Sequence, residues 1–432
     1  MNFFQSAGLS IPVGGALVTL VILLCSCSKS NTVQQDPVIP PPIVPPANTF
    51  SFTPANPDYW NMLDDHYELV VSTTGGEILV DTIMPTKTTV PITFRTTEKL
   101  VDVTTITKYR DTVNQYEVNT YKGVNPSGWD SLYFFYNYNV DPVKYAPSSG
   151  QLKISYINIP TEYNQHYLFY SGAAHANGGA QGINKIDLFY NKVEGLPVYI
   201  QFPTLGLYNL HDQLKPEDTV DVATQMKIAT RLKVNYPSQY TIDNIEVMGF
   251  ADTTDFYKNH ILFEDISWYN TDYQIIYPSD PFYQKYQLKF HLKGTDNDWI
   301  RHFSYSDTVA NDITFYSPSN YTLLSSVKDN FSIQFRDVRP TWWSAGYQSG
   351  PVSYTIYASP DSTSLNPLRL LNTIKSRSHL LGTMNFDDLH VSSFVFEKIE
   401  GMDYASHNNY TFSSGPRTKH LINSADRYIK WY

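Results

Sequence analysis

The chain has 432 residues, among them 34 Tyr, 23 Phe and 7 Trp, and its formal net charge is −10. This acidic balance argues against general nucleic-acid binding, which needs a basic surface. Both cysteines, Cys25 and Cys27, lie near the amino terminus, so disulfides, thiol catalysis and cysteine-ligated metals are excluded for the body of the protein.

The first predicted element is a signal peptide over residues 1–26. Its apolar run from Ala16 to Leu24 is too short to span a bilayer. The run leads into Leu24-Cys25-Ser26-Cys27, which resembles the lipobox of bacterial lipoproteins. The resemblance implies that Cys27 is lipidated and that this lipid attaches the protein to a membrane. No Lys or Arg precedes Lys29, so the usual positive region is missing, and a plain secretory signal is the alternative.

Residues 27–49 are predicted to form a tether. Six prolines crowd the stretch between Asp36 and Ala47. Such a density favours extended polyproline II structure, which acts as a semi-rigid spacer. The tether would hold a folded body away from the lipid surface. A proline-rich ligand for a partner domain is the alternative.

Beyond the tether, apolar and polar residues alternate in many short segments, most clearly over 286–293. This pattern predicts a mostly β fold of two or three antiparallel, immunoglobulin-like β-sandwich domains. Clusters of Pro, Ser and Gly place the domain boundaries so that the predicted domains are an immunoglobulin-like sandwich over 50–142, a sandwich over 143–240 and a larger β-domain over 241–432.

Two local features of the body depart from this strand pattern. Asn366-Pro367 is a good N-cap followed by proline in the first helical position, which predicts a short helix near 367–377. The small residues over 172–182 predict a mobile, exposed loop, with closure over a ligand as the alternative.

The segments Gly75–Thr82 and Leu100–Thr105 resemble the immunoglobulin-like modules of secreted Bacteroidota proteins. The resemblance covers about a quarter of the chain. It implies a β-sandwich and a cell-envelope location, with the outer membrane as the expected site of the lipid anchor. It implies no activity.

Searches for catalytic motifs find no nucleophile elbow, phosphate-binding loop, zinc-protease motif or dinucleotide fingerprint. Glu264-Asp265 with Trp268 provides half of a glycosidase site. Asp296-Asn297-Asp298 and Asp387-Asp388 offer oxygen ligands for calcium, but hydrated turns are the preferred interpretation. We therefore expect no cofactor, no metal and no catalytic residue.

The preferred binding candidate is the segment 339–347, which Pro340, Ser344 and Gly346 predict to be a loop at a sheet end. Sugars and other planar ligands stack on exposed aromatic rings, so Trp342, Trp343 and Tyr347 are the candidate binding residues. In an extended chain the two tryptophans face opposite ways, so one is predicted to be core and the other a platform.

These features predict a non-enzymatic, lipid-anchored cell-envelope protein. The first hypothesis is a glycan- or ligand-binding accessory protein of a nutrient-uptake system. The second is a structural or adhesive subunit similar in plan to fimbrillin-like lipoproteins, and the third is a hydrolase. The expected partners are the membrane, through the lipid, and a polysaccharide or another envelope protein.

Overall fold

The computed structural model describes the chain in the following ranges: 48–54, 67–84, 91–109, 115–127, 131–132, 148–160, 164–171, 174–181, 184–193, 196–212, 215, 217–236, 238–253, 258–266, 274–295, 297–309, 320–412 and 423–430. All of them fall within the unit Pro46–Tyr432. The predicted signal peptide, Cys27 and the tether as far as residue 47 lie outside the described residues. No helix in the described part of the chain is both long and apolar enough to cross a membrane.

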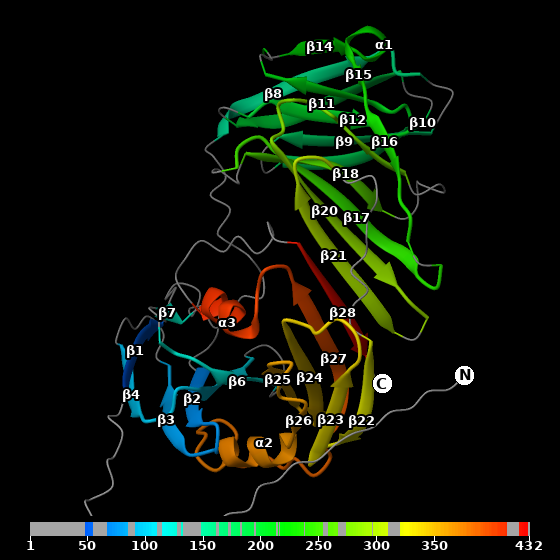
Figure 1. Ribbon diagram of the computed structural model, residues 1–432. Coiled ribbons are helices and arrows are strands. Elements are labelled where there is room, and N and C mark those ends of the chain that lie inside the picture. Colours follow the sequence, from blue (N-terminus) through cyan, green and yellow to red (C-terminus); the bar gives the residue numbers. More distant parts are fainter. Residues whose placement is uncertain are drawn as a thin grey trace, which may run out of the picture. The chain divides into compact units, whose positions relative to one another are not determined.

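The predicted fold class is confirmed, because the structure is 58% strand and 8% helix, with several sheets in which antiparallel pairing dominates. Its largest sheet has twelve strands (Figure 1). In spatial order these are β18 (Asn259–Ile266), β17 (Thr241–Phe250), β20 (Lys285–Lys293), β21 (Asp298–Ser306), β28 (Ser424–Lys430), β27 (His390–Ile399), β24 (Trp342–Ser349), β25 (Val352–Ala358), β6 (Tyr116–Val124), β5 (Val101–Lys108), β2 (Tyr67–Thr73) and β3 (Ile78–Ile83).

One join in this sheet is parallel: β6 pairs with β25, so that Tyr116 lies opposite Val352 and Tyr121 opposite Tyr357. The sheet thus unites strands from the predicted 50–142 region with strands from the predicted 241–432 region. The boundaries near 142 and 240 stay predictions. The parallel pairing itself was not predicted, because nothing in either local pattern specifies a partner that is more than 200 residues away.

Smaller sheets accompany the large one. The three-stranded sheets are β4 (Ile92–Thr96)–β1 (Asn48–Pro54)–β7 (Ser131–Leu132), β11 (Lys185–Val193)–β8 (Ser148–Ile157)–β14 (Asp218–Asp221) and β22 (Tyr321–Val327)–β23 (Asn330–Phe335)–β26 (Ser364–Leu365). A five-stranded sheet contains β10 (Ala174–Gln181), β9 (Asn164–Ser171), β12 (Val198–Phe202), β13 (Leu207–His211) and β15 (Lys227–Ile228), and a two-stranded sheet pairs β16 (Thr230–Lys233) with β19 (Gln274–Tyr277).

The prediction of a mobile, exposed loop over 172–182 is wrong. Ala174–Gln181 forms β10, which pairs antiparallel with β9 over its whole length. Small side chains do not prevent a strand when a neighbour offers a full ladder of backbone hydrogen bonds, since strand formation depends mainly on that tertiary partner.

The helices are α1 (Val222–Gln225), α2 (Pro367–Lys375) and α3 (Tyr404–Phe412). The predicted helix near 367–377 is confirmed as α2. The Asn366 side chain accepts a hydrogen bond of 2.8 Å from the Arg369 backbone N–H, and Pro367 occupies the first turn. α3 was not predicted.

The middle of the twelve-stranded sheet has two faces of different character. We call one the core face: it carries Trp343, Ala345, Ile356, Phe394 and Phe396, which pack against Phe331 and Ile333 of β23 and against α2. We call the other the cavity face: it carries Trp342, Ser344, Tyr357, Val395 and Tyr428. Because side chains alternate along a strand, each of these strands contributes to both faces.

Candidate binding site

The tryptophan pair lies in the centre of the sheet. Trp342–Ser349 forms β24, which pairs with β25 on one side and β27 on the other, so the predicted loop at 339–347 is wrong from residue 342 onward. Gly346 lies within β24 opposite Ser393 of β27, where a Cβ atom would meet the Ser393 hydroxyl group unless that side chain moved. The glycine signal therefore reflected a crowded strand rather than a turn.

Two of the three predicted binding residues belong to the core face. Trp343 has 0% of its surface exposed, packs 5.7 Å from the Phe331 ring and donates its indole N–H to the Ser359 carbonyl oxygen at 3.0 Å. Tyr347 is also fully buried, 6.2 Å from the same ring. The prediction of an exposed platform is wrong for Trp343 and Tyr347, because even-numbered and odd-numbered residues of β24 face opposite sides of the sheet.

The third predicted residue, Trp342, lies on the cavity face and lines a hollow there. Trp342 is also buried, with 8% of its surface exposed, so the prediction of a solvent-exposed platform is wrong for this residue as well. Its ring stacks on His407 of α3 at 5.6 Å and lies 5.7 Å from Tyr357. Its indole N–H donates a 2.7 Å hydrogen bond to Glu397 Oε2. These contacts hold the ring in position at the wall of the cavity.

The cavity has a volume of about 530 Å³. One cross-strand row of the sheet forms much of its lining: Trp299 lies opposite Tyr428, Tyr428 opposite Val395, Val395 opposite Ser344, and Ser344 opposite Tyr357. At roughly 4.8 Å per strand, the backbones of Trp299 and Tyr357 lie about 19 Å apart. The row therefore has aromatic side chains at both ends and small ones in the middle.

The rings at each end of this row form a pair. Trp299 and Tyr428 lie 5.6 Å apart, and Trp342 and Tyr357 lie 5.7 Å apart. Between the pairs, the small side chains of Ser344, Thr355, Ser393 and Val395 leave space. The result is a hollow with aromatic walls and a small, partly hydroxylated floor.

A second cross-strand row supports the first. His291 lies opposite Arg301, Arg301 opposite Asp426, and Asp426 opposite Glu397, which holds Trp342. Arg301 Nε donates a 2.9 Å hydrogen bond to Asp426 Oδ1. Glu397 and Asp426 are both buried. Buried carboxylates need donors, and here those donors are the side chains that line the cavity, so the two acids position Trp342 and Arg301.

His291 adds a polar group to the cavity wall. Burial, reinforced by the neighbouring Arg301 charge, holds the pKa of His291 below its ordinary value. The imidazole is therefore neutral at pH 7 and offers one hydrogen-bond donor and one acceptor. Asp243 is the one carboxylate among the described lining residues.

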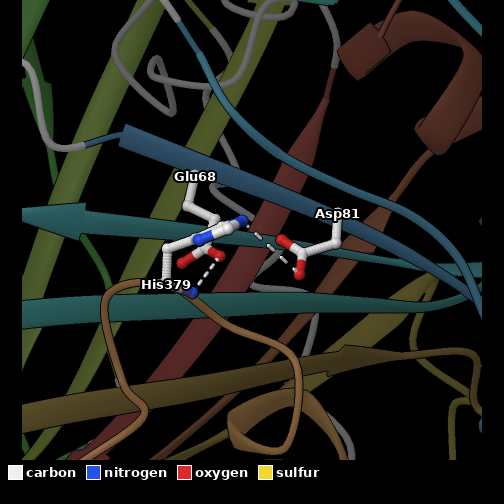
Figure 2. A group of neighbouring side chains, drawn as sticks. All are labelled: Glu68, Asp81 and His379. Carbon is white, nitrogen blue, oxygen red and sulfur yellow. Dashed lines mark hydrogen bonds and ion pairs between the residues drawn. The ribbon is translucent and has the colours of Figure 1, made fainter.

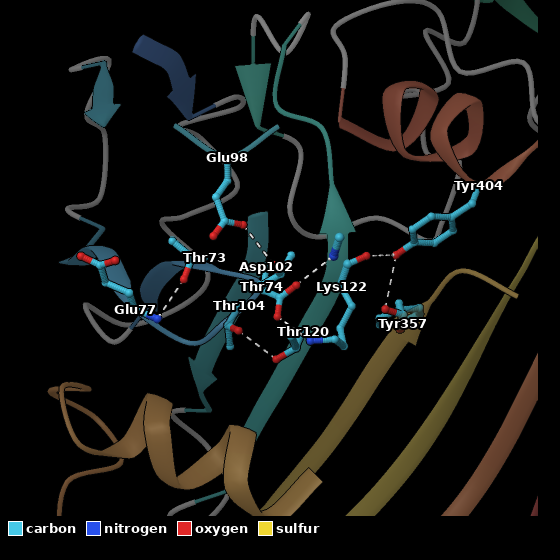
Figure 3. Close-up of polar contacts among 11 residues, drawn as sticks. Thr73, Thr74, Glu77, Glu98, Asp102, Thr104, Thr120, Lys122, Tyr357 and Tyr404 are labelled. Carbon is cyan, nitrogen blue, oxygen red and sulfur yellow. Dashed lines mark hydrogen bonds and ion pairs between the residues drawn. The ribbon is translucent and has the colours of Figure 1, made fainter. Parts of the chain in front are cut away.

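Helix α3 is held against β6 and β25 by hydrogen bonds from its Tyr404 (Figure 3). The Tyr404 hydroxyl donates to the Lys122 carbonyl oxygen at 2.7 Å and lies 3.3 Å from the Tyr357 carbonyl oxygen. Lys122 in turn binds the buried Asp102 at 2.6 Å, and the Asp102 carboxylate also accepts the Gly123 N–H at 2.8 Å. These bonds fasten the helix that carries His407, the stacking partner of Trp342.

Sequence reasoning missed Trp299, Arg301, His291 and Tyr428. The alternation Asp298-Trp299-Ile300-Arg301 was a usable signal, because it places Trp299 and Arg301 on the face opposite the buried Ile300. Of the other predicted site residues, Glu264 lies on β18 and is not part of the cavity lining. Trp268 and Asp296 lie outside the described residues. The Asp388 carboxylate accepts hydrogen bonds from the Ser349 hydroxyl and the Gly350 N–H, as expected for a turn residue.

Comparison with known proteins adds little to this geometry. No protein-family model matches the chain, and no curated protein matches it. Among solved structures, a Ca²⁺-stabilized adhesin that helps an Antarctic bacterium bind ice is 4% identical, with 82% of this chain and 90% of that chain covered and a TM-score of 0.13. Two B repeat units of the Staphylococcus aureus collagen-binding protein are 8% identical, with 72% and 99% covered and a TM-score of 0.12. At such TM-scores neither likeness carries an argument about function.

Proposed function

We propose that this protein binds a carbohydrate in the cavity of the twelve-stranded sheet and performs no chemistry on it. The observation that carries the proposal is the pair of aromatic walls, Trp299 with Tyr428 and Trp342 with Tyr357, on either side of a floor of small side chains. The apolar faces of sugar rings stack on aromatic rings, and the hydroxyl groups of sugars need polar partners at the ring edges.

The charged residues favour binding over hydrolysis. Glycoside hydrolysis needs two carboxyl groups that flank the scissile bond. Asp243 is the one carboxylate that lines the cavity within the described part of the chain, and Glu397 and Asp426 are buried and hold Trp342 and Arg301. These residues support a prearranged binding site, in which little side-chain freedom is lost when the ligand enters.

The rest of the proposal concerns location. A lipid on Cys27 would anchor the protein to the cell envelope, with the outer membrane as the proposed site, and a glycan-binding body suits an accessory role in nutrient uptake. Substitution Cys27→Ser is expected to release the protein from membranes and to abolish palmitate labelling. Labelling that persists in this variant would contradict the anchor.

A second candidate function, a structural or adhesive subunit, is favoured by one observation. β22 is an edge strand of its sheet, and its Leu324 and Val327 are exposed. An edge strand with apolar side chains can accept a strand from another subunit. Concentration-dependent assembly of the full-length protein that Leu324→Lys abolishes would favour this function over glycan binding.

The direct test of glycan binding is a screen of the full-length protein on a polysaccharide array, followed by affinity electrophoresis on each polysaccharide that is retained. Trp299→Ala and Tyr428→Ala are each expected to weaken retention by about two- to tenfold, since each removes one ring of the same aromatic wall and a stacked ring contributes about 0.5–1.5 kcal/mol. Phe189→Ala is the matched control, because Phe189 is an exposed aromatic residue of β11 outside the cavity. Equal retention of all three variants and the wild type would contradict the site.

A further inference from the structure

A second group of polar side chains lies away from the cavity, at the β3 edge of the twelve-stranded sheet. Glu68 of β2, Asp81 of β3 and His379, which follows α2, each offer one ligand atom, and these atoms all lie within 4.8 Å of one another (Figure 2). The imidazole Nε2 of His379 is 4.0 Å from Asp81 Oδ2. Two carboxylates and an imidazole from three separate segments form a mixed oxygen and nitrogen ligand set.

Glu68 is fixed in place before any ligand arrives. Its buried carboxylate accepts hydrogen bonds from the Ser378 hydroxyl at 2.6 Å, the His379 backbone N–H at 2.6 Å and the Leu380 backbone N–H at 3.1 Å. Each carboxylate oxygen has two lone pairs, so these bonds leave acceptor capacity for a further partner. The same bonds hold the 378–380 turn, and with it His379, beside the carboxylate.

Asp81 provides an independent sign of a missing partner. Its Oδ1 atom is buried and has no hydrogen-bond partner in the part of the chain that the structure describes. Two carboxyl groups packed together with an unsatisfied oxygen are costly for the apoprotein, and a cation between them would offset that cost.

We propose that Glu68, Asp81 and His379 bind one divalent transition-metal ion, with Zn²⁺ as the best fit. An imidazole ligand favours zinc over calcium or magnesium, which prefer oxygen-only sites. Zinc bonds of about 2.0–2.2 Å place tetrahedral ligands roughly 3.3–3.6 Å apart, so the ligand atoms must close only slightly. The imidazole can make this movement because His379 is 61% exposed.

Three protein ligands leave the fourth zinc position for water or another ligand. The ion would tie the paired strands β2 and β3 at this edge of the sheet to the turn after α2, which lies about 300 residues later in the chain. The proposed site therefore has a structural consequence, which is independent of glycan binding: Zn²⁺ stabilises this edge of the sheet.

The test is a calorimetric titration of the chelator-treated full-length protein with Zn²⁺, paired with thermal unfolding. Wild type is expected to bind one equivalent and to show a melting temperature that stops rising at one equivalent. Asp81→Asn and His379→Ala are expected to lose about 100-fold or more in zinc affinity, beyond the ten- to hundredfold usual when a group that only supports a ligand is removed. Ser378→Ala, which removes such a supporting hydroxyl group, is expected to lose about tenfold.

His390→Ala is the matched control, because His390 is an exposed histidine outside the group. It is expected to bind zinc as the wild type does. Asp81→Asn also separates ligation from folding: without metal it is expected to melt no lower than wild type, since it removes one of two crowded carboxylates. Failure of wild type to bind one equivalent, equal affinity in Asp81→Asn and His390→Ala, or tighter binding of Ca²⁺ than of Zn²⁺ would overturn the proposal.

Discussion

Trp342 and Trp343 are adjacent in the chain and of the same type, yet they serve opposite faces of one strand. Trp343 is enclosed by aromatic residues of two packed sheets, whereas Trp342 is clamped by Glu397 and His407 at the wall of a cavity. The comparison shows that residue type alone does not distinguish a core aromatic from a binding aromatic. The distinguishing feature is what surrounds each ring: Trp343 lies among large apolar side chains, whereas Trp342 lies beside His407, Tyr357 and the carboxylate of Glu397 and borders a cavity.

The largest expected effect separates the two tryptophans by stability. Trp343→Ala is expected to cost about 3–5 kcal/mol of unfolding free energy, because it leaves a void among Phe331, Phe394 and their neighbours. Trp342→Ala is expected to cost clearly less, since water can occupy the cavity side of the vacated space. Denaturant unfolding of the two variants measures the difference. Equal losses of unfolding free energy would contradict the distinction between a core tryptophan and a cavity tryptophan.

The next effect contrasts a core histidine with a cavity histidine. Burial lowers the pKa of His260 to about 4, and its ring contacts the Pro197 carbonyl oxygen and the Tyr283 hydroxyl. The pKa of His260 in the folded state lies below its unfolded value of about 6.5. The contribution of neutral His260 to the free energy of unfolding is therefore fully present above pH 6.5, and about 3 kcal/mol of it is lost as the pH falls to 4.

His260→Gln is therefore expected to flatten the dependence of unfolding free energy on pH between 6.5 and 4. His291→Gln provides the comparison from the cavity wall, where burial and Arg301 also lower the pKa of the histidine. We expect this substitution to flatten the pH dependence less than His260→Gln does. Denaturant unfolding at a series of pH values measures both. An unchanged slope in His260→Gln would contradict the role of this histidine.

A smaller effect tests the clamp on Trp342. Glu397→Gln keeps the shape of the side chain and removes the charge from the acceptor of the indole N–H. A hydrogen bond to a charged acceptor is stronger than one to a neutral acceptor. The free energy of unfolding is therefore expected to fall by about 1–2 kcal/mol, and the tryptophan fluorescence to change. Glu400→Gln, a neighbouring exposed acid, is the control and is expected to change neither.

The features that depend on neighbouring residues in the chain could be predicted from the sequence. Alternation placed Trp342 and Trp343 on opposite sides, and Asn366-Pro367 located the start of α2. The cavity could not be predicted, because Arg301 meets Asp426 across 125 residues and β6 meets β25 across a still longer separation. Strand order and register depend on contacts between distant segments, and a pattern with a period of two residues leaves them open.

The zinc group illustrates the same limit. Glu68 and His379 are separated by 311 residues, and each reads in the sequence as an ordinary polar residue. Their proximity follows from the position of β2 near one end of the large sheet and from the turn after α2, which the Glu68 carboxylate itself organises.

The most direct test of carbohydrate binding in the cavity is a substitution that fills the cavity without disturbing the fold. Thr355 lies on the cavity floor, whereas Ser353, two residues earlier on the same face of β25, is exposed and outside the lining. Isothermal titration with the polysaccharide that the wild type retains compares Thr355→Tyr with Ser353→Tyr. Affinity is expected to fall at least about tenfold in Thr355→Tyr and to stay at the wild-type value in Ser353→Tyr, with nearly unchanged melting temperatures for both. Wild-type affinity in a folded Thr355→Tyr variant would contradict the claim that this cavity is the binding site.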